Sequence, residues 1–280
     1  MGGRDDDIAE CPDAGTDRRA LPVVQLLPNL VTLLGLCAGL TSIRYVLQEA
    51  YQVAAALLIL SAIIDGMDGL LARKLNAASQ FGAELDSLSD FVCFGVAPGI
   101  FVYHFVLHGM PGLGWVFVLV YVLCACLRLA RFNVNRDAPP PPGRAHFVGV
   151  PAPAGAMLAL LPVFLALAGW VNTQSWPVPV ALYVALVGLL MISRLPTPSP
   201  KGLTVARHHS VWVFLGVAVF AGALAMRPWT VLVLTDLAYL TVLAQGSWAH
   251  RRRLSRGGLA VFFPLDGAGM GGYPPCIARL

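Results

Sequence analysis

The chain has 280 residues, of which 57% are hydrophobic and only 12% are charged. Soluble globular domains carry about 25% charged residues, so this composition excludes an ordinary soluble domain and indicates an integral membrane protein. The net charge of +4 comes from basic residues at the ends of apolar segments, and it does not suggest a nucleic acid partner. The six cysteines form no CxxC pair, so neither a zinc site nor a disulfide framework is indicated.

Eight apolar segments follow one another along the chain. A helix needs about 20 residues to cross the hydrocarbon core of a bilayer, and most of these segments approach that length. We therefore predict an all-α fold, a polytopic membrane helix bundle with about eight transmembrane helices. The predicted spans are residues 29–47, 51–72, 85–107, 113–133, 152–172, 177–194, 210–226 and 228–247.

The basic residues indicate how these spans are oriented. With the N-terminus in the cytoplasm, all but two of the 19 Lys and Arg lie at the cytoplasmic side, and the exceptions are Arg44 and Arg227. This asymmetry favours two cytoplasmic tails, residues 1–22 and 251–280, around a membrane-embedded domain of residues 23–250. The N-terminal tail is rich in acids and lacks the basic start and apolar core of a signal peptide.

Four aspartates lie where the second and third spans are expected to meet the water. They form two pairs, Asp65 with Asp68 and Asp86 with Asp90, and residues three or four apart share one helix face. Acids at membrane depth are costly and are functional by default. The neighbouring cations are too few to neutralise them all. Because Mg²⁺ and Mn²⁺ prefer oxygen ligands, we predict that Asp65, Asp68 and Asp86 bind divalent metal.

The residues between the two pairs suit a phosphate-bearing ligand. Gly69 and Gly82 have no side chain, so a nucleotide can approach the backbone closely, and the small Ala72 serves the same end. Arg73 can pair with a phosphate in a two-pronged fashion. Asp90 lies one turn beyond the nearest predicted metal ligand, and it is the candidate general base.

The spacing of this segment resembles the signature of the CDP-alcohol phosphatidyltransferase family. The pattern is Asp68-Gly69-x2-Ala72-Arg73-x8-Gly82-x3-Asp86-x3-Asp90, with Asp65 three residues earlier, and every fixed position is filled. Further segments resemble the phosphatidylserine synthase branch of that family, and the similarity covers roughly residues 25–205. These segments are LPNLVTLLGL at 27–36, residues 80–98, LRLARFNV at 127–134, FVGVPAPA at 147–154 and SRLPTPSPK at 193–201.

The resemblance implies an activity. Such enzymes transfer a phosphatidyl group from CDP-diacylglycerol to the hydroxyl of L-serine, giving phosphatidylserine and CMP. It also implies a six-helix membrane core among membrane lipids, a cytoplasmic active site and a homodimer, here in a bacterial inner membrane. By position, Asp65, Asp68 and Asp86 would bind two divalent ions, Mg²⁺ or Mn²⁺, and Asp90 would act as base with a metal contact. The nucleotide would meet Asn29, Thr32, Asp65, Asp68, Gly69, Ala72, Arg73 and Gly82.

The acceptor is expected to meet basic residues at cytoplasmic helix ends. Arg128, Arg131 and Arg194, and more weakly Lys201, are candidates for the serine carboxylate or a lipid phosphate, although anchoring by the positive-inside rule explains them equally well. If Arg131 grips the carboxylate, Arg131→Ala raises the KM for serine. Asp236 is isolated in the last span, where we expect a structural role: either a hydrogen bond with a neighbouring threonine, Thr235 or Thr241, or a position facing a polar cavity.

Three alternative functions are a sister enzyme, a transporter and an inactive family member. A sister phosphatidyltransferase would use glycerol 3-phosphate, an inositol phosphate or choline as acceptor. A cation-coupled membrane transporter would use the aspartates to pass ions, but transporters tend to place charges at the midplane and to show internal repeats. A degenerate member without activity is disfavoured because all four aspartates are intact.

Overall fold

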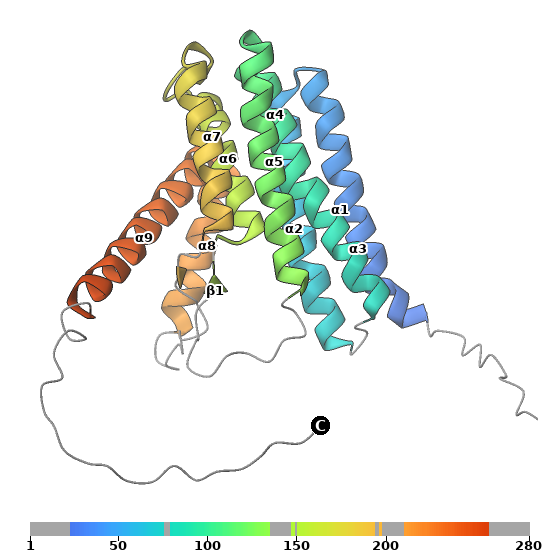
Figure 1. Ribbon diagram of the computed structural model, residues 1–280. Coiled ribbons are helices and arrows are strands. Elements are labelled where there is room, and N and C mark those ends of the chain that lie inside the picture. Colours follow the sequence, from blue (N-terminus) through green and yellow to red (C-terminus); the bar gives the residue numbers. More distant parts are fainter. Residues whose placement is uncertain are drawn as a thin grey trace, which may run out of the picture.

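The computed structural model describes residues 23–75, 79–134, 147–148, 150–193, 196–197 and 210–257. Within these ranges the chain is a bundle of helices, which confirms the predicted all-α fold (Figure 1). In chain order the elements are α1 (Val23–Leu47), α2 (Tyr51–Lys74), α3 (Gln80–Asp90), the π-helix η1 (Phe91–Val96), α4 (Ala97–Phe105), the 3₁₀ turn η2 (Leu107–Gly109), α5 (Pro111–Val134), β1 (Phe147–Val148), α6 (Ala152–Leu167), the 3₁₀ turn η3 (Thr173–Ser175), α7 (Pro177–Ile192), β2 (Pro196–Thr197), α8 (Ser210–Met226) and α9 (Pro228–Gly257). The two short strands pair antiparallel.

Each of the eight predicted spans is helical. Five are long and apolar enough to cross a membrane, and they are Leu27–Leu47, Tyr51–Leu71, Gln80–Phe105, Pro111–Val134 and Pro228–Gly246. Helices α6 and α7 have 16 residues each, so each is about 24 Å long, somewhat less than the hydrocarbon core. Both end before the sequence predicted, because the chain turns at Gly169 with a positive φ and at Ser193 with an extended backbone.

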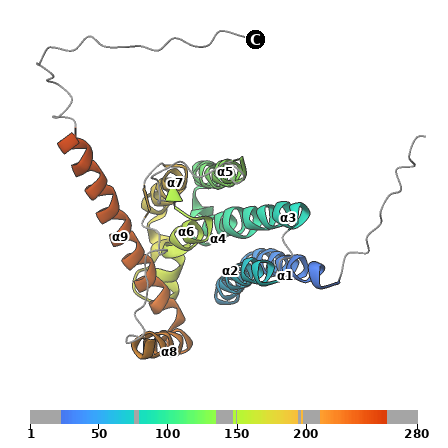
Figure 2. The same ribbon diagram turned by 90° about the horizontal axis from the view of Figure 1, so that it is seen from below.

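The bundle has a buried centre and a looser flank. Figure 2 shows α4 and α6 between the α1–α2 pair and the α5–α7 pair, with α9 crossing at one side and α8 beside it. Most residues of α6 are buried, among them Leu158, Leu160 and Phe164. Many apolar side chains on the outer helices remain exposed. They suit contact with lipid tails, because lipid tails are as apolar as these side chains.

Small residues let α1 approach its neighbours closely. A Cβ atom added to Gly39 would lie 2.6 Å from Cys93 Sγ, and one added to Gly35 would lie 3.3 Å from the Ile64 side chain. The Ser61 hydroxyl donates to the Gly35 carbonyl at 3.0 Å across the same contact. Spacing of small residues by four is a known device for close packing of membrane helices. It brings the first turns of α1 against the end of α2 that carries the predicted metal ligands.

Two tyrosines, the buried Tyr121 and the half-buried Tyr183, compensate for prolines inside the helices. Proline has no N–H, so it leaves the carbonyl four residues earlier without its usual partner. For Pro98 that carbonyl belongs to Phe94, and the Tyr121 hydroxyl donates to it at 2.7 Å. For Pro162 it belongs to Leu158, and the Tyr183 hydroxyl donates at 2.8 Å. The first bond lies in η1, so Tyr121 holds the π-helical turn that begins immediately after Asp90.

Candidate functional site

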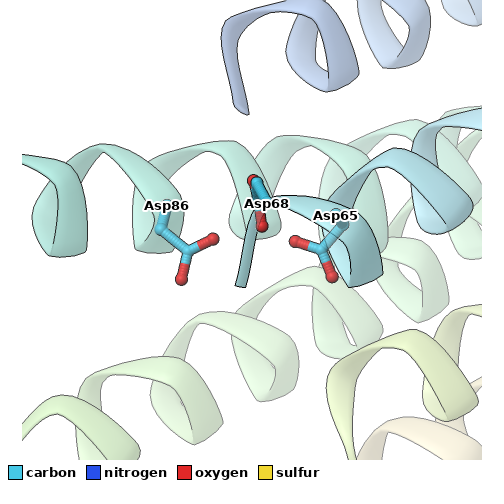
Figure 3. Close-up of side chains that lie close together, drawn as sticks. All are labelled: Asp65, Asp68 and Asp86. Carbon is cyan, nitrogen blue, oxygen red and sulfur yellow. The ribbon is translucent and has the colours of Figure 1, made fainter. Parts of the chain in front are cut away.

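The structure brings three of the predicted metal ligands together. Asp65 and Asp68 lie one turn apart near the end of α2, and Asp86 faces them from α3 (Figure 3). One carboxylate oxygen from each lies within 4.8 Å of the others. Asp68 is buried, with 4% of its surface exposed, whereas the other two are half-buried. The two aspartates spaced three residues apart on α2 are therefore joined by a third carboxylate from α3.

The donor set fits a hard divalent cation. Three carboxylates at this separation repel one another unless a positive charge lies between them. All three offer only oxygen, which is the ligand type that Mg²⁺, Mn²⁺ and Ca²⁺ take. Thr32 on α1 donates from Oγ1 to Asp68 Oδ2 at 2.7 Å, and this bond orients one of the ligands. The cluster is thus a candidate site for a divalent metal.

Asp90 stands beside this cluster and is not one of its three members. It is the last residue of α3, and its carboxyl group lies within hydrogen-bonding reach of Asp65. Its Oδ1 atom is buried and has no hydrogen-bond partner among the described residues. The Arg128 guanidinium, on α5, is within electrostatic range. Asp90 therefore offers a carboxylate oxygen that the fold itself does not use.

The carboxylates of α2 and α3 help to line a small pocket, most of whose lining residues are polar. Its lining residues are Thr32, Gly35, Ser61, Asp65, Asp68, Ser89, Asp90, Cys93 and Phe94. The buried Cys93 thiol donates to the Gly35 carbonyl at 3.6 Å, so it packs here as a small side chain. Helices α1, α2 and α3 and the π-helical turn thus meet around the acids.

The two glycines of the signature have different surroundings. A Cβ added to Gly82 would lie 2.6 Å from Asn29 Oδ1, so α1 presses its Asn29 amide against this turn of α3. Ser79 caps α3 by accepting a hydrogen bond from the Gly82 N–H at 3.0 Å. A Cβ added to Gly69 would meet nothing within 4 Å, so open space adjoins this part of α2. The backbones of Ala72 and Arg73 continue α2, while their side chains lie outside the description.

The predicted acceptor residues are not equivalent. Arg128 is half-buried, and its Nε donates to the Val150 carbonyl at 2.7 Å, which fixes the guanidinium near Asp90. Arg131 is exposed and donates from Nη1 to the Ile192 carbonyl at 3.3 Å, a contact between α5 and the end of α7. Arg194 and Lys201 lie outside the described residues.

Two polar features of this region were not predicted from the sequence. Asn133 on α5 donates from Nδ2 to Ser87 Oγ at 3.0 Å, and this bond ties α5 to α3 next to Asp86. Asp236 on α9 is buried, but the expected threonine bonds are wrong: Thr235 donates to Val231 and Thr241 donates to Ala238. Asp236 was singled out from the sequence, whereas Tyr239, three residues further along the same face of α9, was not.

A helix bundle of membrane-spanning length that gathers three carboxylates at the junction of α2 and α3 defines an integral membrane protein with a candidate divalent-metal site. The family model described as CDP-alcohol phosphatidyltransferase matches residues 25–192, and the chain belongs to that family. The family expectation drawn from the signature is therefore confirmed. The match ends at the last residue of α7, so α8 and α9 lie beyond it.

Three curated relatives are named CDP-diacylglycerol–serine O-phosphatidyltransferase. The protein from Mycobacterium leprae (strain TN) is 42% identical over 228 residues, which cover 80% of this chain and 74% of the relative. That from Mycobacterium tuberculosis (strain H37Rv) is 38% identical over 222 residues, covering 78% and 76%. That from Helicobacter pylori (strain 26695) is 34% identical over 208 residues, covering 72% and 83%.

Proposed function

We propose that this protein transfers the phosphatidyl group of CDP-diacylglycerol to the hydroxyl of L-serine, giving phosphatidylserine and CMP. The observation that carries the proposal is the convergence of Asp65, Asp68 and Asp86 beside Asp90, within the family match. The names of the relatives at 34–42% identity support serine as the acceptor.

In the proposed reaction Asp90 is the general base. Its Oδ1, which has no partner within the described ranges, accepts the proton of the serine hydroxyl. The serine oxygen forms a bond to the phosphorus that carries the diacylglycerol. The bond from that phosphorus to the bridging oxygen of the diphosphate breaks, and CMP leaves with the electron pair. No enzyme nucleophile takes part, so the transfer is a direct displacement.

Asp65, Asp68 and Asp86 would hold divalent metal, which we propose to be two ions of Mg²⁺ or Mn²⁺. When bound, such ions neutralise the charge of the diphosphate and support its in-line displacement. The chain's own contribution is to orient the carboxylates. Thr32 fixes Asp68 through its 2.7 Å hydrogen bond, and the π-helical turn held by Tyr121 fixes the end of α3 that carries Asp90.

The nucleotide is proposed to lie over α1, the end of α2 and the start of α3. The open space at Gly69 allows a ligand to reach the backbone of α2. Asn29, on α1, lies against Gly82 of α3 and offers its amide. Ala72 and Arg73 follow Gly69 along α2. The acyl chains of the donor would remain among the membrane lipids, beside the exposed apolar faces of the helices.

Arg128 is the proposed partner of the serine carboxylate, because its anchored guanidinium lies near the base. Arg131, Arg194 and Lys201 are proposed to contact a lipid phosphate or to anchor the helix ends. We also propose a homodimer in the bacterial cell membrane, with the active site and both tails in the cytoplasm. The distribution of basic residues supports that orientation.

The test follows CMP release by purified protein in mixed micelles that contain CDP-diacylglycerol and Mg²⁺ or Mn²⁺. L-serine, glycerol 3-phosphate, an inositol phosphate and choline are compared as acceptors, with Asp90→Asn beside the unchanged protein. Of the four acceptors, we expect only L-serine to support CMP release. The rate of release should fall at least about 100-fold in Asp90→Asn, since general bases contribute roughly 10²–10⁴ to a rate. Release with another acceptor instead would contradict serine as the substrate.

A further inference from the structure

Helix α9 lies beyond the family match, yet it packs on α6 at the centre of the bundle. It contacts α6 and the strand β2, and β2 pairs with β1, which ends two residues before Val150. The Val150 carbonyl is the group that holds the Arg128 side chain. The face of α9 turned inward carries Val233, Asp236 and Tyr239, spaced three residues apart. Tyr239, on this face of α9, is within electrostatic range of Arg128.

The Tyr239 hydroxyl is buried and has no hydrogen-bond partner in the part of the chain that the structure describes. By contrast, the hydroxyl groups of the buried Tyr121 and the half-buried Tyr183 both donate to backbone carbonyls, at 2.7 and 2.8 Å. Buried hydroxyl groups are nearly always paired, and an exception calls for a water, an ion or a ligand. The fold leaves this hydroxyl available for one.

The Arg128 guanidinium interacts electrostatically with the two residues that carry such atoms. It is within electrostatic range of both Asp90 and Tyr239, and the Nε bond to Val150 fixes its position. Asp90 Oδ1, like the Tyr239 hydroxyl, is buried without a partner among the residues described. A positive charge within electrostatic range of both a base and a hydroxyl donor matches a small acceptor that carries a carboxylate and an alcohol.

We propose that Tyr239 is a specificity-determining residue of the acceptor pocket, where its hydroxyl donates a hydrogen bond to the carboxylate of a small hydroxy amino acid held on Arg128. The alcohol of that acceptor then points to Asp90. This inference rests on the proposed function, since it assigns the part of the site that recognises serine. It also gives α9 a role, because a helix outside the family match completes the pocket.

The test is Tyr239→Phe, which removes one oxygen and keeps the ring, with Tyr183→Phe as a matched control. The control also removes the hydroxyl of a half-buried tyrosine, but that hydroxyl donates to the Leu158 carbonyl within the fold. We expect Tyr239→Phe to raise the KM for L-serine about tenfold or more, as for a lost hydrogen bond to a charged group. The KM for CDP-diacylglycerol and the kcat at saturating serine should change less than twofold. Tyr183→Phe should lower the melting temperature and leave the KM for serine unchanged.

Three outcomes overturn the proposal. A KM for serine within twofold of the unchanged protein shows that the hydroxyl does not contact the acceptor. An equal rise in both variants shows a general effect of losing a buried hydroxyl. A rise in the KM for CDP-diacylglycerol alone places Tyr239 at the donor. Failure of the unchanged protein to release CMP with serine refutes the proposed function itself, and is distinguished from the other outcomes by that measurement.

Discussion

Replacing each signature glycine by alanine tests the different surroundings of Gly69 and Gly82. Alanine is favoured over glycine inside a helix by about 0.5–1 kcal/mol. At Gly69 nothing opposes that gain, because an added Cβ meets nothing within 4 Å. We therefore expect Gly69→Ala to stabilise the fold by about 0.5–1 kcal/mol. If the open space holds the nucleotide, the same methyl group obstructs it, and the KM for CDP-diacylglycerol rises.

At Gly82 the gain is opposed by a steric conflict. The added Cβ would lie 2.6 Å from Asn29 Oδ1, so the Asn29 side chain must leave its rotamer. Off-rotamer side chains cost about 0.5–1.5 kcal/mol, which cancels the helical gain. We expect Gly82→Ala to leave the free energy of unfolding nearly unchanged, and to lower activity because the Asn29 amide is displaced.

The double variant Asn29→Ala/Gly82→Ala isolates this contact. With the amide removed, the helical gain should return, so the two changes should show a coupling energy of about 0.5–1.5 kcal/mol. The measurement is denaturant unfolding of the protein in detergent, together with the kinetics of CMP release. Equal stability of Gly69→Ala and Gly82→Ala, with no coupling to Asn29, would refute the reasoning.

Three further predictions concern the support of the site. Thr32→Val keeps the shape of the side chain but removes the 2.7 Å bond to Asp68; the Mn²⁺ concentration at half-maximal activity should rise about tenfold, and an unchanged metal dependence would contradict the role given to Thr32. Tyr121→Phe leaves the Phe94 carbonyl unpaired and should destabilise the fold by about 1–3 kcal/mol while lowering kcat, as measured by unfolding and CMP release; full stability would show that the π-helical turn holds without it. Chelation by EDTA should abolish CMP release, and Mg²⁺ or Mn²⁺ but not Na⁺ should restore it, whereas activity that survives chelation would argue against metal at Asp65, Asp68 and Asp86.

The local part of the site could be predicted from the sequence. Aspartates spaced by three or four along helices must share a face, and apolar runs around them place that face at the membrane boundary. The structure agrees where it brings Asp86 to Asp65 and Asp68. Gly82 shows the limit of such reasoning, because its contact with Asn29 joins helices α1 and α3, and their separation follows from packing alone.

Features that depend on distant contacts could not be predicted. Tyr239 reaches the neighbourhood of Arg128 only because α9 packs on α6 and β2. Pro98 indicates from the sequence that the helical hydrogen bonding is interrupted near the π-helical turn that follows Asp90. The sequence does not reveal that Tyr121 fills the vacant bond. The end of α6 was also predicted too late, because apolar residues continue to Val171 whereas the helix ends at Leu167.

The most direct test of the proposed activity is the transfer of labelled L-serine into lipid. Purified protein in micelles with CDP-diacylglycerol and Mn²⁺ should move the label into the chloroform phase as phosphatidylserine, in equal amount to the CMP released. Asp90→Asn should leave the label in the aqueous phase. If folded, metal-loaded protein leaves all of the label in water and yields no CMP, the proposed function is contradicted.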